Sequence, residues 1–204
     1  MEISLKDTNF FLDRFSMHIK EVKTAIKIGD FVLRKNHRNK IDIKYLPSLS
    51  NKVLTDNSAR IYLIVQDGII KKIGGSASKG GIKATMMFYI SAMTGSPGVP
   101  RFIVHLLLER ALRSKSKVEL FMITSPRTLA RVSGLFGYKR VEIASFKEME
   151  DLCKSDYYRR EKKYPEWNFQ ENHEPYPPEL AGEHNAYHQK RLKKIRSNFS
   201  AGKK

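Results

Sequence analysis

The chain has 204 residues, of which 41% are hydrophobic and 29% are charged, enough for one well-buried domain with extensions and too few for two. Its 38 Lys and Arg against 21 Asp and Glu give a net charge of +17, which indicates a polyanionic partner. Nucleic acid is the first candidate, and an anionic membrane surface is the alternative. The single cysteine, Cys153, excludes an internal disulfide framework and a cysteine-based zinc site. No stretch reaches the roughly 20 apolar residues that span a bilayer, so we expect a soluble, cytoplasmic protein without a secretory leader.

The N-terminal segment predicts a core-facing helix. Capping side chains at residues 7–9 precede apolar residues at helical spacing, and Gly29 ends the pattern. Those apolar residues are Phe11, Phe15, Ile19, Val22 and Ile26. Residues 34–40, which follow, are strongly basic and form either a solvated loop or a phosphate contact.

Residues 60–75 predict a β-hairpin, because two β-branched apolar runs flank Gln66-Asp67-Gly68 and Asp-Gly is a strong turn signal. A hairpin would bring Tyr62 and Lys72 onto neighbouring strands. An ammonium beside a phenol lowers the pKa of the phenol, which makes Tyr62 a candidate base. The alternative is a half-buried strand tyrosine and an exposed strand lysine.

Two elements are expected between residues 82 and 112. Residues 82–93 show no clean period, so they form either a helix or a buried strand. A loop over 94–100 is followed by a helix over 101–112, and the apolar face of this helix is too broad for an exposed surface. Arg101 and His105, four residues apart, share one side of it.

Alternating side chains predict a strand over residues 117–123. Ser125-Pro126 is expected to start a short helix that ends near Gly134 or Gly137, and residues 138–144 are expected to form a further strand. Ser145 and Glu148 have the spacing of a capping box, so a helix begins there and runs to about residue 162.

Glu150 lies on the face of this helix that is expected to turn inward, with Phe146, Cys153 and Tyr157. Because burying an unpaired charge is costly, a carboxylate on an apolar face needs a metal ion or a cationic neighbour. The alternative is a partly exposed helix glutamate. After the helix, Asn168 follows the only tryptophan in what we expect to be a packed turn.

The C-terminal segment combines a linker with a basic end. Three prolines mark the linker, and residues 183–198 are expected to form a terminal helix. From Lys190 onward there are seven Lys or Arg and no acidic residue, so this end is either a tail that binds a nucleic-acid backbone or a disordered segment. The prolines are Pro175, Pro177 and Pro178.

Taken in order, these residues resemble the motifs of the GIY-YIG nuclease superfamily, particularly its small restriction-endonuclease-like members. Arg60-Ile61-Tyr62 stands at the first motif, with arginine in place of glycine. Lys72-Ile73-Gly74 stands at the second, with lysine in place of tyrosine. The later motif residues, an arginine with a histidine four positions on, a glutamate and an asparagine, are matched by Arg101, His105, Glu150 and Asn168.

The resemblance implies an α+β fold with a small antiparallel or mixed central sheet flanked by helices. Residues 59–170 would form this nuclease core. Residues 1–58 would form a helical and basic N-terminal extension, and residues 171–204 would form a basic C-terminal extension.

The resemblance also implies phosphodiester hydrolysis that depends on one Mg²⁺ ion, for which Mn²⁺ could substitute. In this mechanism Tyr62 is the general base, helped by His105 or Lys72, and Glu150 binds the metal ion. Arg101 holds the nonbridging phosphate oxygens, and Asn168 orients its neighbours.

We therefore expect a sequence-specific endonuclease that cuts double-stranded DNA, as restriction enzymes do. The alternatives are a homing or repair nuclease of the same superfamily and a non-catalytic nucleic-acid-binding protein. Cutting a palindromic site would need a homodimer on the DNA or two successive visits. Charge, rather than any motif, nominates the residues that contact DNA: Arg34, Lys35, Arg38, Lys40, Lys79, Lys83, Lys190, Arg191, Lys193 and Lys194.

Overall fold

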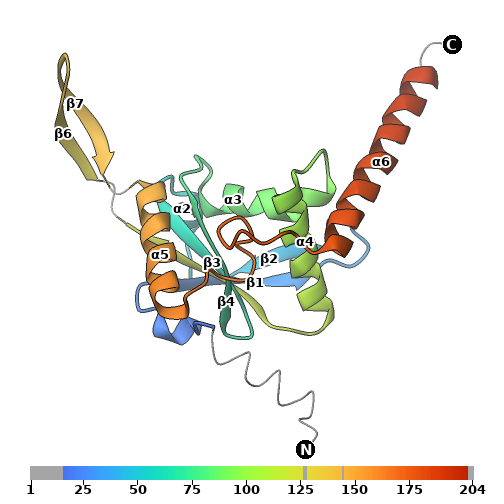
Figure 1. Cartoon of the computed structure of the whole chain (residues 1–204), viewed down its shortest axis with the longest axis horizontal. Helices are drawn as coiled ribbons and strands as arrows, with labels where there is room; N and C mark the ends of the chain where they lie inside the picture. Colours follow the sequence, from blue (N-terminus) through green and yellow to red (C-terminus); the bar gives the residue numbers. More distant parts are fainter. Residues whose placement is uncertain (1–15, 126–127, 144, 202–204) are drawn as a thin grey trace, which may run out of the picture.

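The computed structural model describes residues 16–125, 128–143 and 145–201. Its centre is a five-stranded sheet in the order β2-β1-β5-β3-β4, and every neighbouring pair of strands is antiparallel (Figure 1). The strands are β1 (Ile26–Leu33), β2 (Ile41–Tyr45), β3 (Arg60–Gln66), β4 (Ile69–Ser76) and β5 (Val118–Thr124). Helices flank the sheet, so the expected α+β class is confirmed.

Two apolar clusters, one on each face of the sheet, make up the core. On one face Tyr62 and Ile64 of β3 pack with residues of α3 (Gly81–Ile90) and α4 (Val99–Arg113). On the other face Ile61 and Leu63 pack with Tyr157 of α5 (Phe146–Glu161) and with η2 (Ile19–Glu21). Strand β3 is therefore buried on both sides, as its continuous apolar sequence predicts.

The predicted hairpin is present as β3 and β4. Asp67 and Gly68 form its turn with φ values of 50° and 88°, the positive φ at both positions that a type I′ turn requires. The register pairs Tyr62 with Gly74 and Ile64 with Lys72. Tyr62 and Lys72 are therefore diagonal neighbours rather than direct cross-strand partners.

The predicted N-terminal helix is wrong in the part that the structure describes. Residues 19–21 form only the short turn η2, and residues 26–33 form β1; Phe11 and Phe15 lie outside the described residues. Strand β1 lies between β2 and β5, and Gly29 there has no room for a Cβ because the backbone of β2 is too close. Long-range strand pairing has overridden the helical spacing.

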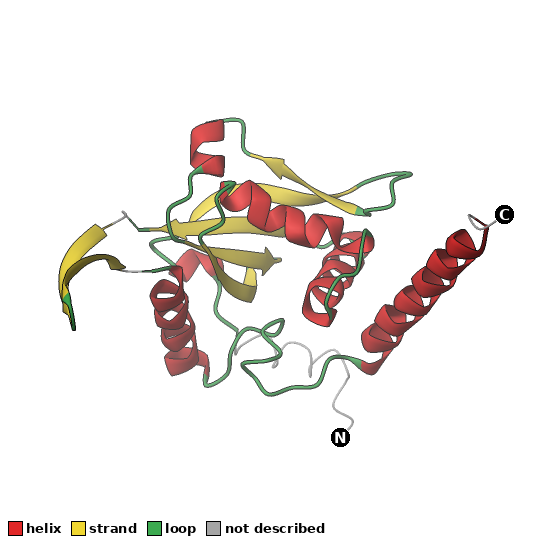
Figure 2. Cartoon of the chain, turned by 90° about the horizontal axis from the view of Figure 1, so that it is seen from above, coloured by secondary structure: helices red, strands yellow, loops and turns green. Residues whose placement is uncertain are grey.

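A second correction concerns the helix expected after Ser125-Pro126. Residues 128–134 form β6 (Thr128–Gly134), which pairs antiparallel with β7 (Gly137–Ile143), and Pro126 lies outside the described residues. The two strands form a separate two-stranded sheet. Figure 2 shows this hairpin and the helix α6 (Pro178–Ala201) extending from opposite ends of the molecule.

The remaining helical predictions are confirmed in position. Residues 81–93 form α3 and the short turn η3 (Ser91–Met93), which resolves the choice between helix and strand. Helix α5 begins at the predicted capping box, in which Glu148 accepts a hydrogen bond from the backbone N–H of Ser145 at 2.8 Å. A short helix, α2 (Asn51–Thr55), precedes β3. No helix in the described ranges is long and apolar enough to cross a membrane.

Candidate functional site

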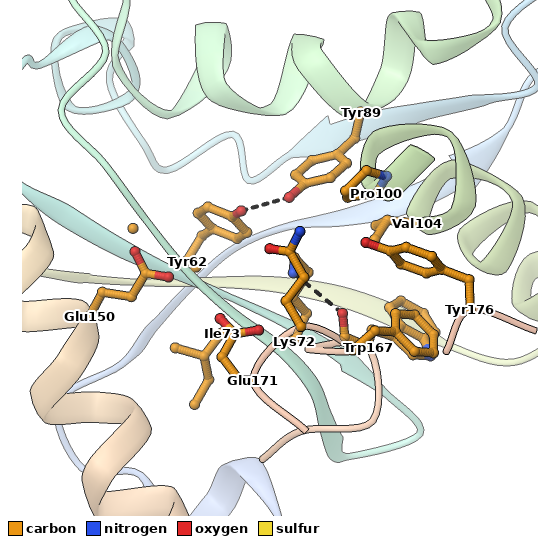
Figure 3. A pocket seen from close by; sticks show the side chains of 14 residues that line it. Tyr62, Lys72, Ile73, Tyr89, Pro100, Val104, Glu150, Trp167, Glu171 and Tyr176 are labelled. Carbon is orange, nitrogen blue, oxygen red and sulfur yellow. Dashed lines mark hydrogen bonds between the residues drawn. The ribbon is translucent and has the colours of Figure 1, made fainter. Parts of the chain in front are cut away.

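A pocket of about 230 Å³ opens at the edge of the sheet that β4 forms (Figure 3). Its polar lining comes from both layers that cover the sheet. Tyr62, Lys72 and Tyr89 belong to the layer of α3 and α4, whereas Glu150 comes from α5 on the opposite face. Gln170, Glu171 and Tyr176, from the segment after α5, add to the polar lining. The phenol, amine and carboxylate singled out in the sequence therefore share one pocket.

Two successive glycines of β4 make this meeting sterically feasible. A Cβ built on Gly74 would lie within 3.0 Å of the Oη, Cζ and Cε1 atoms of Tyr62. A Cβ built on Gly75 would lie 2.5 Å from Oε2 of Glu150. Because successive strand residues face opposite sides, one glycine admits the phenol and the next admits the carboxylate.

Tyr62 is almost fully buried, and its hydroxyl lies 2.7 Å from that of Tyr89, with which it shares a hydrogen bond. Burial raises the pKa of Tyr62 well above its usual value of 10, and proximity to Tyr89 and to Glu150 adds to the effect. Burial likewise raises the pKa of Tyr89 to about 12. The expected lowering of the phenol pKa by Lys72 is therefore not found.

Lys72 extends into the same pocket, and its Nζ lies 3.4 Å from the carbonyl oxygen of Trp167 (Figure 3). Burial lowers the pKa of this amine below its usual value of 10.5 and outweighs the opposing effect of Glu171. The environment thus favours the neutral forms of both groups, a phenol at Tyr62 and an amine at Lys72.

Glu150 has the cationic neighbour that its position on an inward face required. Lys154, one turn further along α5, lies 2.6 Å from Glu150 and also forms an ion pair with Glu171. Burial works to raise the pKa of Glu171, but the hydrogen bond and charge of Lys154, together with a backbone hydrogen bond and one from Asn168, outweigh it, so the pKa lies below 4.5. Two carboxylates thus share one ammonium at the rim of the pocket. Among the described residues, no three His, Cys, Asp or Glu side chains are grouped to hold a metal ion.

The side chain of Asn168 forms hydrogen bonds with the backbone of the edge strand β4. The side chain accepts a hydrogen bond from the N–H of Ile73 at 2.9 Å and donates one to the carbonyl of Ile73 at 3.0 Å. The N–H of Trp167 donates to the carbonyl of Lys71 in the same way. This loop covers part of the free edge of β4 and holds the strand segment that carries Lys72 and Gly74.

Arg101 and His105 do not line the pocket, contrary to expectation. The guanidinium of Arg101 stacks on Phe88 at 4.4 Å and bonds the hydroxyl of Ser91. His105 is fully buried, its Nδ1 lies 2.8 Å from the carbonyl oxygen of Tyr89, and its Nε2 has no hydrogen-bond partner. Because α4 turns its apolar face to the sheet, His105 supports the backbone of α3 instead of facing the pocket.

Sequence reasoning missed several polar residues of the site, including Tyr89, Lys154 and Glu171. Lys154 could have been found, because it follows Glu150 by four residues on a predicted helix. Tyr89 lies in a segment whose sequence shows no clean helical or strand period, and Glu171 lies in a loop without a local signal.

The basic residues expected to contact DNA lie outside this pocket. One group is in the loop between β1 and β2, one is at the start of α3 and one is in the second half of α6. Half-buried side chains are Lys40, Lys83 and Arg191, and exposed side chains are Arg34, Lys35, Arg38, Lys79, Lys190, Lys193 and Lys194.

No protein-family model and no curated protein matches this chain. Among solved structures, a mutant of bacteriophage T4 EndoII is similar, with a TM-score of 0.50, 22% identity and coverage of 74% of this chain and 98% of EndoII. The restriction endonuclease HPY188I, in complex with product DNA, matches with a TM-score of 0.45 and 16% identity over 81% of this chain and 95% of its own. The likeness to EndoII shows that the two chains share a fold.

Proposed function

We propose that this protein is a metal-dependent endonuclease of the GIY-YIG type that cuts double-stranded DNA at specific sites. The observation that carries the proposal is the pocket at the edge of β4, where Tyr62, Lys72 and Glu150 come together from two layers of the fold. The shared fold with EndoII, which its name describes as an endonuclease, supports the same activity. The charge of +17 fits a duplex backbone as the substrate.

Glu150 is the residue that would hold a divalent cation, and Glu171 offers a second carboxylate on the same ammonium. Hard carboxylate oxygens are the ligands that Mg²⁺ and Mn²⁺ prefer, and Glu150 would hold the ion. Its carboxylate reaches the edge of β4 because Gly75 lacks a side chain, and a bound ion would replace Lys154 as its cationic partner. When bound, such an ion supplies Lewis-acid stabilisation of the charge that develops on the phosphate.

The protein's own groups handle the proton of the attacking water. Phenol with amine and phenolate with ammonium contain the same number of protons, so Tyr62 can act as a base when Lys72 holds the displaced proton. The raised pKa of Tyr62 and the lowered pKa of Lys72 both shift the pair toward its neutral forms, which cost less to bury than the charged ones. Tyr89 fixes the direction of the Tyr62 hydroxyl, and Asn168 positions the strand that carries Lys72.

Plasmid cleavage by wild type and by Glu150→Gln, with Mg²⁺ and with EDTA, tests this function. Glu148→Gln is the matched control, because glutamine preserves the capping box on the same helix. We expect discrete fragments from wild type and Glu148→Gln with Mg²⁺ only, and a loss of at least about 10²-fold in Glu150→Gln. A protein that retards the plasmid but never cuts it, with Mg²⁺ or Mn²⁺, would instead be a non-catalytic binder.

A further inference from the structure

The hairpin of β6 and β7 has an apolar tip that contacts nothing else in the described structure. Leu135 and Phe136 form the tip between Gly134 and Gly137, and their side chains are 96% and 99% exposed. Neighbouring apolar residues on the strands, including Leu129 and Tyr138, are also exposed. Two large apolar side chains at the end of a projecting element indicate a binding function.

The strands of this hairpin are basic. Arg131 and Arg140 are direct cross-strand partners, and the guanidinium of Arg131 stacks on Tyr138 at 4.3 Å. Lys139 adds a third cation, and the one acidic residue of the two strands is Glu142, which pairs with Leu129 far from the tip. Like charges directly opposite each other destabilise a strand pair unless an anion lies between them. The arrangement therefore suits a polyanionic partner.

Neither face of the β6–β7 hairpin is covered by another described element. Its strands pair only with each other, and every side chain described from residue 128 to 141 is exposed except the half-buried Ala130. An isolated two-stranded hairpin is marginally stable in water, so a partner would order it. A second copy of the chain is a poor partner, since it would place Arg131 and Arg140 against further cations.

We propose that the β6–β7 hairpin is an arm that grips duplex DNA, with its basic strands on the phosphates and Leu135 and Phe136 as a wedge between base pairs. This inference rests on the proposed function, because it takes duplex DNA as the substrate. A strand of seven residues spans roughly 23 Å, and a two-stranded ribbon fits a major groove about 12 Å wide. Apolar side chains inserted between base pairs, as in many minor-groove binders, unstack base steps and bend the duplex. Figure 1 shows the arm and α6 at opposite ends of the molecule, extending toward the same side.

A tryptophan placed at the tip reports the wedge directly. After the emission change of wild type, which contains Trp167, is subtracted, Phe136→Trp should lose emission when a DNA duplex is added in EDTA, because stacking on bases quenches the indole. Leu152→Trp, on the exposed side of α5, is the matched control and should keep its emission. If the emission of Phe136→Trp stays unchanged while the duplex is bound, the tip does not insert and the inference is overturned. If the emission changes when the protein concentration is raised without DNA, the tip binds a second copy of the chain, which also overturns the inference.

The charges of the arm are tested by salt dependence. The double variant Arg131→Gln with Arg140→Gln should reduce the slope of log K against log salt by about 1.8, the value for two lost phosphate contacts. The variant Arg159→Gln, an exposed cation of α5, should leave the slope unchanged. An unchanged slope in the double variant would contradict the arm. If wild type does not cleave DNA but the tip tryptophan is quenched, the DNA-binding arm is supported and the proposed hydrolysis is wrong. If wild type cleaves DNA but the tip tryptophan is not quenched, the hydrolysis is supported and the arm is wrong.

Discussion

Gly74→Ala tests whether the close approach of β4 and Tyr62 builds the site. The new Cβ would lie within 3.0 Å of three atoms of the Tyr62 ring and hydroxyl. The Tyr62 ring cannot move away freely, because it is buried and its hydroxyl is hydrogen-bonded to the hydroxyl of Tyr89 at 2.7 Å. We therefore expect both the packing and the hydrogen bond to be disturbed.

The magnitude follows from these two contacts. Overpacking a core costs about 1–3 kcal/mol, and losing the buried hydrogen bond adds about 1 kcal/mol. The lower entropy of the unfolded alanine chain offsets about 0.5–1 kcal/mol. Gly74→Ala should thus lower the free energy of unfolding by about 1–3 kcal/mol. Displacing the phenol by about 1 Å should also reduce DNA cleavage by about 10²-fold.

Urea denaturation followed by circular dichroism measures the loss of stability. Gly182→Ala is the matched control, because a Cβ there meets nothing within 4 Å and the residue lies in helix α6. It should stabilise the protein by about 0.5–1 kcal/mol. The double variant with Tyr62→Leu should show a coupling of at least about 1 kcal/mol, because the clash is removed. Additive effects, or a Gly74→Ala midpoint equal to that of wild type, would refute the reasoning.

Three further predictions concern the polar groups of the site. Burial lowers the pKa of Lys72, so its amine becomes neutral at lower pH than a free lysine. Single-turnover cleavage should therefore rise with pH through this lowered pKa, and the always-charged Lys72→Arg should flatten the rise. Lys154 holds the pKa of Glu171 below 4.5, so this stabilisation is present above pH 4.5 and is lost as the pH falls through the lowered value. Lys154→Met should accordingly unfold at less urea at neutral pH and lose less stability on acidification. Asn168→Ala leaves the N–H and carbonyl of Ile73 without partners, which should cost about 2–4 kcal/mol in urea denaturation; an unchanged midpoint would contradict its positioning role.

Local signals in the sequence determined several parts of this protein. Asp67-Gly68 predicted the β3–β4 hairpin, and the capping box at Ser145 predicted the start of α5. The helical spacing of Glu150 predicted that its carboxylate faces inward and needs a cation. Each of these signals depends on residues within four or five positions of one another, and such short-range preferences can be read without knowing the fold.

Only the tertiary structure decided which residues meet in the pocket. The pairing of β1 with β2 and β5 joins segments that are far apart in the chain, and it overrode a helical pattern. Likewise, Tyr89 rather than His105 reaches Tyr62, because the packing of α3 and α4 on the sheet sets which side of each helix faces β4. Burial on the sheet also reversed the expected pKa shift of Tyr62, since the cost of desolvating a phenolate depends on the surrounding layers and not on its neighbours in sequence.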